Sequence, residues 1–426
     1  MSVQVKYKGK LVGKVVMNNN QYFFKYENAF LELGVDLAPL QMPLKNSKGK
    51  IYTFPNLNPN TFYGLPGLIA DSLPDKFGNN ILNTWLNKKG KDLSSLNSLE
   101  RLSYIGNRGM GALEFLPEIK NELFSKLNDA KINLNELSDI SQQIISSKKD
   151  LKVNAKNNIS LAQLIDVGTS AGGARAKALV SINDKTGEIK ADHQKSEKDF
   201  SYYIVKFDTI SDQTNVSTEV CLTEYAYYKM ARKAGIDMMT SKLLEENGRF
   251  HFATKRFDRT NSGEKIHTQT LCAMGHYDYR DFTNNSYENL FYVARAINVD
   301  YRSREQLFRM MVLNVITRNL DDHSKNFGFL MTKTGKWKVS PAYDINFNYD
   351  PKGLFTQYHK MSINGKVENI NRADLLELAK QNSINKPENI IKEIKEAASL
   401  FPQIAKNNSI SEELSTYIAS CFLMEI

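Results

Sequence analysis

The first 26 residues alternate between two kinds of position, as strands do when one face packs on a core. The side chains that share a face fall in three short runs: Val3, Val5 and Tyr7, then Leu11, Gly13 and Val15, then Tyr22 and Phe24. The sequence Asn18-Asn19-Asn20 separates the last two runs, and asparagine is favoured in tight turns because it tolerates a left-handed backbone. The pattern predicts a small antiparallel meander at the start of the chain.

The pattern changes farther along the chain. Residues 66–85 predict a turn and then a helix, with Pro74 near its start and Ser72 or Asp75 as the capping residue. Apolar positions repeat at helical spacing in segments near the C-terminus: 304–314, 372–381, 387–397 and 411–420. We therefore expect an α+β protein with a mixed α/β N-terminal lobe and a mostly helical C-terminal lobe, joined near Phe257.

Composition limits the class of protein. A chain of 426 residues is longer than one ordinary core supports, so we expect two or three domains. The longest apolar runs are far shorter than a membrane span, and the N-terminus begins a strand pattern, not a signal peptide. Three scattered cysteines without CxxC spacing argue against a disulfide framework and a zinc site, and fit the reducing cytoplasm, where we expect the protein. The net charge of +9 is compatible with a solvated basic surface or with an anionic partner.

The stretch RNLDDHSKN, residues 318–326, carries the most specific chemical signal. In protein kinases the base Asp precedes a metal-binding Asn by five residues, and a second metal-binding Asp follows a short hairpin. Asp321 and Asn326 have that separation, and Asp344 follows two apolar runs joined by a turn that contains Gly335. Mg²⁺ prefers hard oxygens and keeps water and phosphate ligands, so one amide oxygen and one carboxylate suffice on the protein side. The alternative is a polar loop whose acids are solvated.

Residues 168–177 (GTSAGGARAK) form a Gly-rich loop that leads into an apolar strand, whereas a Walker A loop leads into a helix. Small residues allow backbone N–H groups to approach phosphates, although turns alone explain most Gly pairs. Lys206 follows in the strand YYIVKF, where it either reaches solvent at the strand edge or holds nucleotide phosphates. The next helix offers Glu224, or as second choice Glu219, as the acid that would pair with Lys206.

The segment FATKRFDR, residues 252–259, predicts a short strand that leaves the N-terminal lobe. In a kinase this place is a hinge that offers backbone groups and an aromatic face to adenine; the alternative is an ordinary strand end. Because these elements follow one another in the order found in protein kinases, we predict a two-lobed protein-kinase-like fold. Its predicted parts are a β-rich leading subdomain (1–118), the remainder of the N-lobe (119–257) and a helical C-lobe (258–426).

The same segments resemble a known family. GTSAGGARAKALV, YIVKFD, ATKRFDR, NVITRNLDDHSKNFGFL and SPAYDI, in this order, resemble the HipA family of serine/threonine kinases, which are the toxins of bacterial HipBA-type toxin–antitoxin modules. GKLVGKVVMNNNQYFFKYENAFL and GLPGLIADSLPDKFGNNIL look like the leading subdomain of that family, so the resemblance covers nearly the whole chain. It implies a HipA-like fold that uses ATP and Mg²⁺.

The resemblance implies a role for each matching residue. Asp321 would be the general base, and Asn326 and Asp344 would hold Mg²⁺. The residues implied to bind ATP are Gly172, Gly173, Ala174, Arg175, Ala176, Lys177 and Lys206, then Lys255, Arg256 and Phe257, then His323, Ser324, Lys325, Asn326 and Tyr343. Lys255 stands where an acidic residue is common in the family, so we expect adenine to be contacted there through the backbone.

The resemblance also implies how the activity is used and controlled. In the family a serine of the Gly-rich loop is phosphorylated, which displaces the loop and switches the kinase off; Ser170 matches that position, and Thr169 is a second acceptor. The implied target is a protein serine, with an aminoacyl-tRNA synthetase as the expected substrate, and the implied partner is a HipB-like antitoxin that binds operator DNA. The alternatives are a catalytically weak regulator that acts through antitoxin and operator DNA, and a small-molecule or lipid kinase on a related fold.

Overall fold

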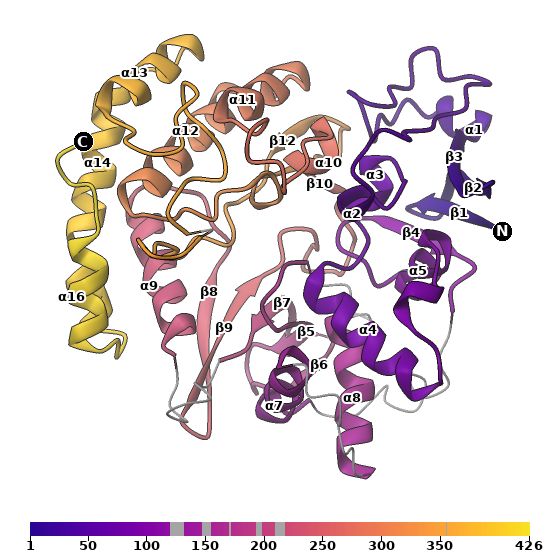
Figure 1. Ribbon diagram of the computed structural model, residues 1–426, viewed down its shortest axis with the longest axis horizontal. Helices are drawn as coiled ribbons and strands as arrows, with labels where there is room; N and C mark the ends of the chain where they lie inside the picture. The colour runs from indigo at the N-terminus through magenta and orange to yellow at the C-terminus, as the bar shows by residue number, and fades with distance from the viewer. Residues whose placement is uncertain (120–131, 147–154, 170–171, 193–197, 209–217, 355) are drawn as a thin grey trace.

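The computed structural model describes residues 1–119, 132–146, 155–169, 172–192, 198–208, 218–354 and 356–426. These residues form three antiparallel sheets with helices around them (Figure 1). In Figure 1 the N-terminal strands, the five-stranded sheet and the C-terminal helices occupy three separate regions of the molecule. The division of the chain at residues 118 and 257 stays a prediction.

The first sheet has the strand order β3-β2-β1-β4. Its strands are β1 (Ser2–Tyr7), β2 (Lys10–Asn18), β3 (Gln21–Tyr26) and β4 (Leu113–Leu116). Asn19 and Asn20 adopt φ angles of 47° and 58°, the left-handed backbone of the predicted turn, so the antiparallel meander is confirmed. The helices α1 (Asn28–Leu31) and α5 (Ser98–Ile105) pack against this sheet. The same part of the chain also contains α2 (Pro59–Phe62), α3 (Gly67–Ala70) and the 3-10 turn η1 (Leu93–Ser95).

The second sheet has five strands in the order β6-β5-β7-β9-β8. They are β5 (Lys177–Asn183), β6 (Ile189–Ala191), β7 (Phe200–Lys206), β8 (Ser241–Glu246) and β9 (Arg249–Lys255). On one face Val180 and Val205 join a hydrophobic core with three helices, α4 (Lys76–Lys88), α7 (Leu134–Ile145) and α8 (Ala155–Gly168), which Figure 1 shows gathered beside this sheet. Because side chains alternate along a strand, Lys206 lies on the opposite face from Val205. Helix α9 (Val220–Lys233) packs against β8 and β9.

The C-terminal part is mostly helical. Its small sheet contains β10 (Thr268–Thr270), β11 (Gly328–Met331) and β12 (Trp337–Val339). Its helices are α10 (Leu271–Gly275), α11 (Tyr287–Ala296), α12 (Tyr301–Ile316), α13 (Arg372–Gln381), α14 (Pro387–Ser399), α15 (Phe401–Lys406) and α16 (Glu412–Ser420), with the 3-10 turn η2 (Ser324–Asn326). The four predicted helical segments fall on α12, α13, α14 and α16, and the predicted hairpin is β11–β12.

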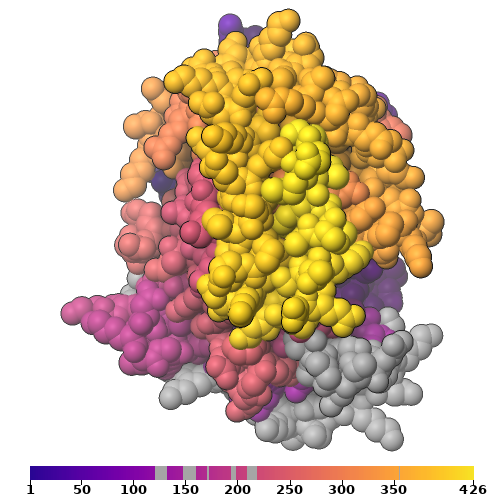
Figure 2. All heavy atoms as spheres, turned by 90° about the vertical axis from the view of Figure 1, so that its left-hand side faces the viewer, coloured from indigo at the N-terminus to yellow at the C-terminus, as the bar shows by residue number. Residues whose placement is uncertain are grey.

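The C-terminal helices cover one side of the molecule. Figure 2 shows the C-terminal residues, in yellow, forming the surface there. One of the C-terminal helices, α15, packs on α9, where the ring centroids of Tyr227 and Phe401 lie 5.6 Å apart. Among the described residues no helix is both long and apolar enough to cross a membrane.

The leading subdomain is joined to the C-terminal lobe by close packing. A Cβ on Gly67 of α3 would lie only 2.3 Å from the Ala273 carbonyl oxygen of α10, so glycine permits this approach. Nearby, the carboxylate of Asp278 accepts hydrogen bonds of 2.5 Å from Asn58 Nδ2 and from Thr61 Oγ1. One continuous hydrophobic core contains buried residues of both parts. The leading subdomain therefore rests on the helical lobe as well as on the five-stranded sheet.

Three histidines of the protein stay neutral, and one of them, His276, links the leading subdomain to the C-terminal lobe. His276 Nε2 accepts a 2.9 Å hydrogen bond from the Gly67 N–H, which an imidazolium could not do. Burial lowers the pKa of His276 to about 4. Burial likewise lowers the pKa of His251 to about 4 and that of His267 to about 4.

The low pKa values of these histidines predict that the protein loses stability in mild acid. Because an unfolded histidine has a pKa of about 6.5, the unfolded chain takes up protons first as the pH falls. The stabilisation is therefore complete above about pH 6.5 and decreases towards pH 4, by up to about 1.4 kcal/mol per pH unit for each histidine. Urea denaturation between pH 4 and 7 measures this slope. His276→Gln keeps an acceptor for Gly67 but does not titrate, so the slope of stability against pH should decrease by about 1.4 kcal/mol per pH unit, which corresponds to one proton. An unchanged slope would contradict the neutral state of His276.

Candidate active site

The two adjacent acids of the predicted catalytic loop lie in different environments. The Asp321 side chain is 51% exposed, and its Oδ1 lies 3.8 Å from His323 Nε2. Asn326 Nδ2 donates a 2.6 Å hydrogen bond to the Asp321 backbone oxygen, which fixes the distance between the two residues along the loop. The Asp321 carboxylate is thus accessible to a substrate while its backbone is held.

Asp322 is buried and structural. Its Oδ2 accepts a 2.8 Å hydrogen bond from Tyr287 Oη and lies 2.7 Å from His359 Nδ1, and its Oδ1 accepts from the Lys360 N–H at 2.7 Å. The Asp322 side chain is fully buried. Asp322 therefore ties the segment around residue 360 to the catalytic loop. Sequence reasoning gave it no role, because its partners lie far away in the chain.

The hairpin β11–β12 carries the chain back towards the catalytic loop. Gly335 in its turn has a φ of 79°, as the predicted turn requires. Tyr343 Oη then donates a 2.8 Å hydrogen bond to the Lys325 backbone oxygen, which places the next residue, Asp344, near the loop. Asp344 has a φ of 53°, a strained backbone for a residue with a side chain, and such strain is concentrated at functional sites.

Lys206 joins the two lobes electrostatically. Its Nζ donates to Glu224 Oε1 of α9 at 2.5 Å and forms a second ion pair with Asp344 Oδ1. Burial alone would lower the pKa of Lys206, but the carboxylates of Asp344 and Glu224 outweigh it and raise the pKa. Glu219, the second choice for this pairing, was wrong: its carboxylate accepts a hydrogen bond from the Ser411 N–H, because its left-handed backbone lies just before α9 begins.

Two further cations lie beside Lys206. Lys177 is directly opposite it in the β5–β7 register, and Arg175 Nη1 donates to Glu224 Oε2 at 2.7 Å. Burial would raise the pKa of Asp344, but Lys206 and Lys177 outweigh burial and hold it well below its usual range. Three cations thus surround two carboxylates, Glu224 and Asp344, and the cluster has a formal excess of one positive charge. Such a cluster attracts an anion with several negative oxygens, such as a phosphate chain.

The Gly-rich loop begins its described part at Gly172 and turns back over Lys177. Gly173 has a φ of 95°, and a Cβ there would lie 2.7 Å from Lys177 Nζ. Gly172 and Ala174 are exposed, and Arg175 and Ala176 are partly exposed. The loop therefore lies next to the cationic cluster. Thr169 is buried, and its Oγ1 donates to the Ile165 carbonyl oxygen, so in this conformation it is closed to phosphorylation; Ser170 lies outside the described residues.

The structure does not bring every predicted ATP contact to this cluster. Lys255 pairs with Tyr203 in the β7–β9 register, so its side chain lies on the sheet face opposite Lys206. The Lys255 side chain therefore does not line the cleft, and the expected contact with adenine through its backbone stays a prediction. Arg256 is fully buried between Asp192 and Asp258, and Ser324 Oγ is fully buried and donates to the Tyr277 carbonyl oxygen. These two side chains are engaged within the fold and are not free to bind a ligand.

Four other predicted ATP contacts lie near Asp344 and the predicted catalytic loop: Phe257, Tyr343, His323 and Lys325. The ring centroids of Phe257 and Tyr343 are 5.6 Å apart. The ring of His323 contacts that of Tyr279, and its Nδ1 is buried without a hydrogen-bond partner among the described residues. Lys325 Nζ forms an ion pair with Asp75 of the leading subdomain. Sequence reasoning missed Asp75 as a site residue and treated it as a helix cap; it does precede α4, but its side chain makes no capping hydrogen bond.

The residues present fit a Mg²⁺ ion. Asn326 uses its Nδ2 towards Asp321, which leaves the amide oxygen for a cation, and Asp344 supplies a carboxylate whose low pKa keeps it ionised. Among the described residues no group of three or more His, Cys, Asp and Glu could hold a metal. A cation here would therefore complete its shell with phosphate oxygens and water, as Mg²⁺ does with nucleotides.

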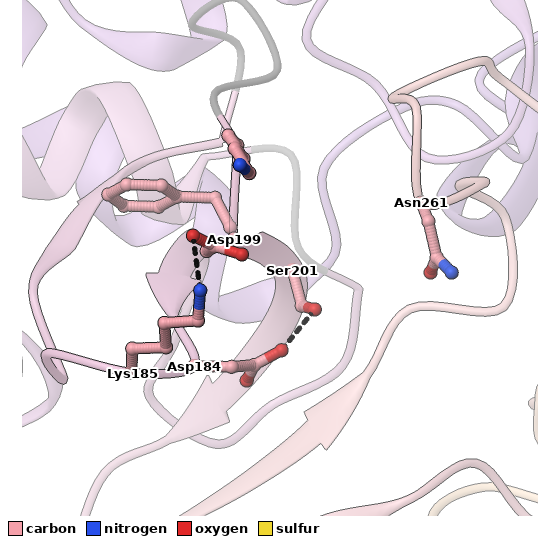
Figure 3. Close-up of a pocket in the computed structure, with 7 residues that line it drawn as sticks. Asp184, Lys185, Asp199, Ser201 and Asn261 are labelled. Carbon is pink, nitrogen blue, oxygen red and sulfur yellow. Dashed lines mark hydrogen bonds and ion pairs between the residues drawn. The ribbon is translucent and has the colours of Figure 1, made fainter.

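A hollow of about 520 Å³ lies elsewhere, at the end of the five-stranded sheet (Figure 3). It is lined by Asp184, Lys185, Lys198, Asp199, Phe200, Ser201 and Asn261. Figure 3 shows the Lys185–Asp199 ion pair and the Ser201–Asp184 hydrogen bond at its wall. None of the predicted site residues lines it. Among its charged residues, Lys185 pairs with Asp199, while Asp184 pairs with Lys242 and Lys255 outside the hollow. We therefore place the candidate active site at the cationic cluster.

Three features define a two-lobed, protein-kinase-like fold. They are the five-stranded antiparallel sheet, a lysine ion-paired to the following helix, and the predicted catalytic loop in a helical lobe. Sequence comparison then gives the family. Residues 3–116 match the HipA N-terminal domain, and residues 169–401 match the HipA-like C-terminal domain. The chain belongs to the HipA family, as the sequence motifs predicted.

A solved structure supports this fold over nearly the whole chain. HipA from Shewanella oneidensis MR-1, determined in complex with HipB and operator DNA, matches with a TM-score of 0.64 and 18% identity, over 98% of this chain and 94% of that chain. The proinflammatory kinase CtkA of Helicobacter pylori matches more weakly, with a TM-score of 0.36 and 17% identity over 51% of this chain and 84% of that chain. No curated protein sequence matches this chain significantly.

Proposed function

We propose that this protein is an ATP- and Mg²⁺-dependent serine/threonine protein kinase that acts as the toxin of a type II toxin–antitoxin module. The observation that carries the proposal is Lys206, ion-paired to both Glu224 and Asp344 at the junction of the lobes. In the proposed mechanism Lys206 would bind phosphate, Glu224 would orient Lys206 and Asp344 would bind the metal, which are parts that protein kinases use in phosphoryl transfer.

The remaining residues supply the other parts of the reaction. The phosphates would be bound by Lys177, Arg175 and the Gly-rich loop. Adenine would be contacted by the rings of Phe257 and Tyr343. Mg²⁺ on Asn326 and Asp344 would neutralise charge on the phosphates. The exposed Asp321 carboxylate would accept the proton of the substrate hydroxyl, which is the role of the Asp of the kinase catalytic loop.

The proposed partners rest on the family and on a solved complex of another member. The Shewanella HipA was solved with HipB and operator DNA, and we propose a HipB-like antitoxin as the partner here, with DNA reached through it. We propose a protein serine as the acceptor, on an aminoacyl-tRNA synthetase, so that its phosphorylation arrests translation and growth. Ser170 is the proposed site of inhibitory autophosphorylation. The buried Thr169 is a poorer acceptor.

Mass spectrometry after incubation with Mg-ATP tests the proposal. The tryptic peptide 157–175 contains Ser160, Thr169 and Ser170, and fragmentation distinguishes them. We expect phosphate on Ser170 only when ATP and Mg²⁺ are both present, with EDTA as the control. If neither phosphate nor ATP binding is found, the second candidate is favoured, a regulator that acts through antitoxin and operator DNA, with which the net charge of +9 is compatible.

A further inference from the structure

The first turn of α4, in the leading subdomain, lies against both described flanks of the Gly-rich loop. The Gly173 N–H donates a 2.8 Å hydrogen bond to Asp75 Oδ2, and the Gly173 carbonyl oxygen accepts one of 3.3 Å from the Phe77 N–H. On the other flank, a Cβ on Gly78 would lie 2.4 Å from the Thr169 carbonyl oxygen, so only glycine allows this contact. The loop is therefore docked on α4 through its backbone.

The same carboxylate reaches the catalytic loop. Asp75 Oδ1 forms an ion pair with Lys325 Nζ, and Lys325 stands between Asp321 and Asn326 in the chain. The Lys325 ammonium also lies 4.8 Å from the centre of the Tyr279 ring. The side chains of Asp75 and Lys325 are only 17% and 16% exposed, so solvent screens this pair weakly. Burial would raise the pKa of Asp75, but Lys325 outweighs it and the pKa is lowered.

We propose that Asp75 is a positioning residue of the nucleotide site, which holds the Gly-rich loop at a fixed distance from the catalytic loop by binding Gly173 with one oxygen and Lys325 with the other. The inference rests on the proposed function, because it takes the Gly-rich loop to be the cover of the ATP phosphates. A loop of small residues loses much conformational freedom when it becomes ordered. If Asp75 orders the loop beforehand, ATP binding does not have to do so.

Asp75 could instead compete with a phosphate for these two donors. The cationic cluster argues against that reading, because Arg175, Lys177 and Lys206 already give an excess of positive charge without Lys325. The hydrogen bond from Phe77 to Gly173 also docks the loop in the same place without any carboxylate. Lys325 has in addition a second acid nearby, Asp71, and its paired ammonium serves to hold the subdomain.

Two measurements on the full chain test the role of Asp75. Hydrogen–deuterium exchange of peptides that cover residues 172–180 reports how firmly the loop is docked when no nucleotide is present. The dissociation constant of Mg-ATP reports whether that docking helps binding. Asp75→Ala should speed exchange in these peptides and weaken ATP binding about tenfold to 100-fold, the range expected for hydrogen bonds to a charged group. Asp75→Asn keeps an acceptor for Gly173 but not the ion pair, so its effects should be smaller.

Asp278→Ala is the matched control. This substitution removes another carboxylate that joins the leading subdomain to the C-lobe, through Asn58 and Thr61. Asp278 makes no contact with the described part of the Gly-rich loop. The substitution should leave both loop exchange and ATP binding unchanged. Equal effects of Asp75→Ala and Asp278→Ala would overturn the proposal, because they would show only loosened packing of the leading subdomain. Tighter ATP binding by Asp75→Ala would also overturn it, because it would show that Asp75 competes with the phosphates. If the unaltered protein binds no ATP, the proposed function fails, while the exchange data still decide whether Asp75 docks the loop.

Discussion

Replacing Asp321 with asparagine is expected to lower the rate of phosphoryl transfer by about 10²- to 10⁴-fold, the usual contribution of a general base. Asparagine has almost the same shape, and the backbone oxygen that accepts from Asn326 is unchanged. The Asp321 side chain is 51% exposed, so the fold does not depend on its charge. The affinity for ATP and the thermal midpoint should therefore stay close to those of the unaltered protein.

The neighbouring Asp322→Asn variant should behave in the opposite way. Three donors face the buried Asp322 carboxylate, from Tyr287, His359 and the Lys360 N–H, and an amide would place its own NH₂ group against one of them. An unsatisfied buried donor costs about 1–3 kcal/mol, so this variant should lower the free energy of unfolding. Single-turnover transfer and thermal unfolding, measured on both variants, separate the two roles. Undiminished transfer by Asp321→Asn would refute the base assignment.

The difference between these two acids shows what the sequence could and could not predict. Spacing along the chain identified Asp321, Asn326 and Asp344, because a loop and a hairpin are local structures whose geometry follows from residue separation. The same spacing could not tell which of two adjacent carboxylates is buried. That depends on Tyr287 and on the segment near His359, which come from other elements and are joined only by the tertiary fold.

The fold class was predictable for a similar reason. Alternation and helical spacing are set by which face each element buries, and they gave the meander, the hairpin and the C-terminal helices. The strand register was not predictable, and it decides whether a side chain such as Lys255 enters the cleft. The link from Asp75 to Gly173 and Lys325 spans 98 and 250 residues, and no local signal distinguishes it from a helix cap.

Arg256 provides the second large expected effect. Its guanidinium is completely buried and forms ion pairs with Asp192 and Asp258. Asp258 also accepts a 2.7 Å hydrogen bond from the Gly111 N–H and pairs with Arg259, so the cluster joins the hinge to the leading subdomain. Removing one partner of a buried ion pair costs about 3–5 kcal/mol, because the remaining charge stays buried. Arg256→Met should therefore lower the free energy of unfolding by about that amount.

Two matched variants sharpen this prediction. Arg256→Lys keeps the charge but cannot reproduce the paired bonds to Asp258, so it should recover only part of the loss. Lys255→Met alters the adjacent residue, whose side chain is 29% exposed and whose ammonium lies 3.4 Å from Asp184. It should change the free energy of unfolding by no more than about 1 kcal/mol. Urea denaturation measures all three. If Arg256→Met kept its stability but bound ATP more weakly, Arg256 would be a ligand of the nucleotide, as the family resemblance implied, and its buried ion pairs would not be its main role.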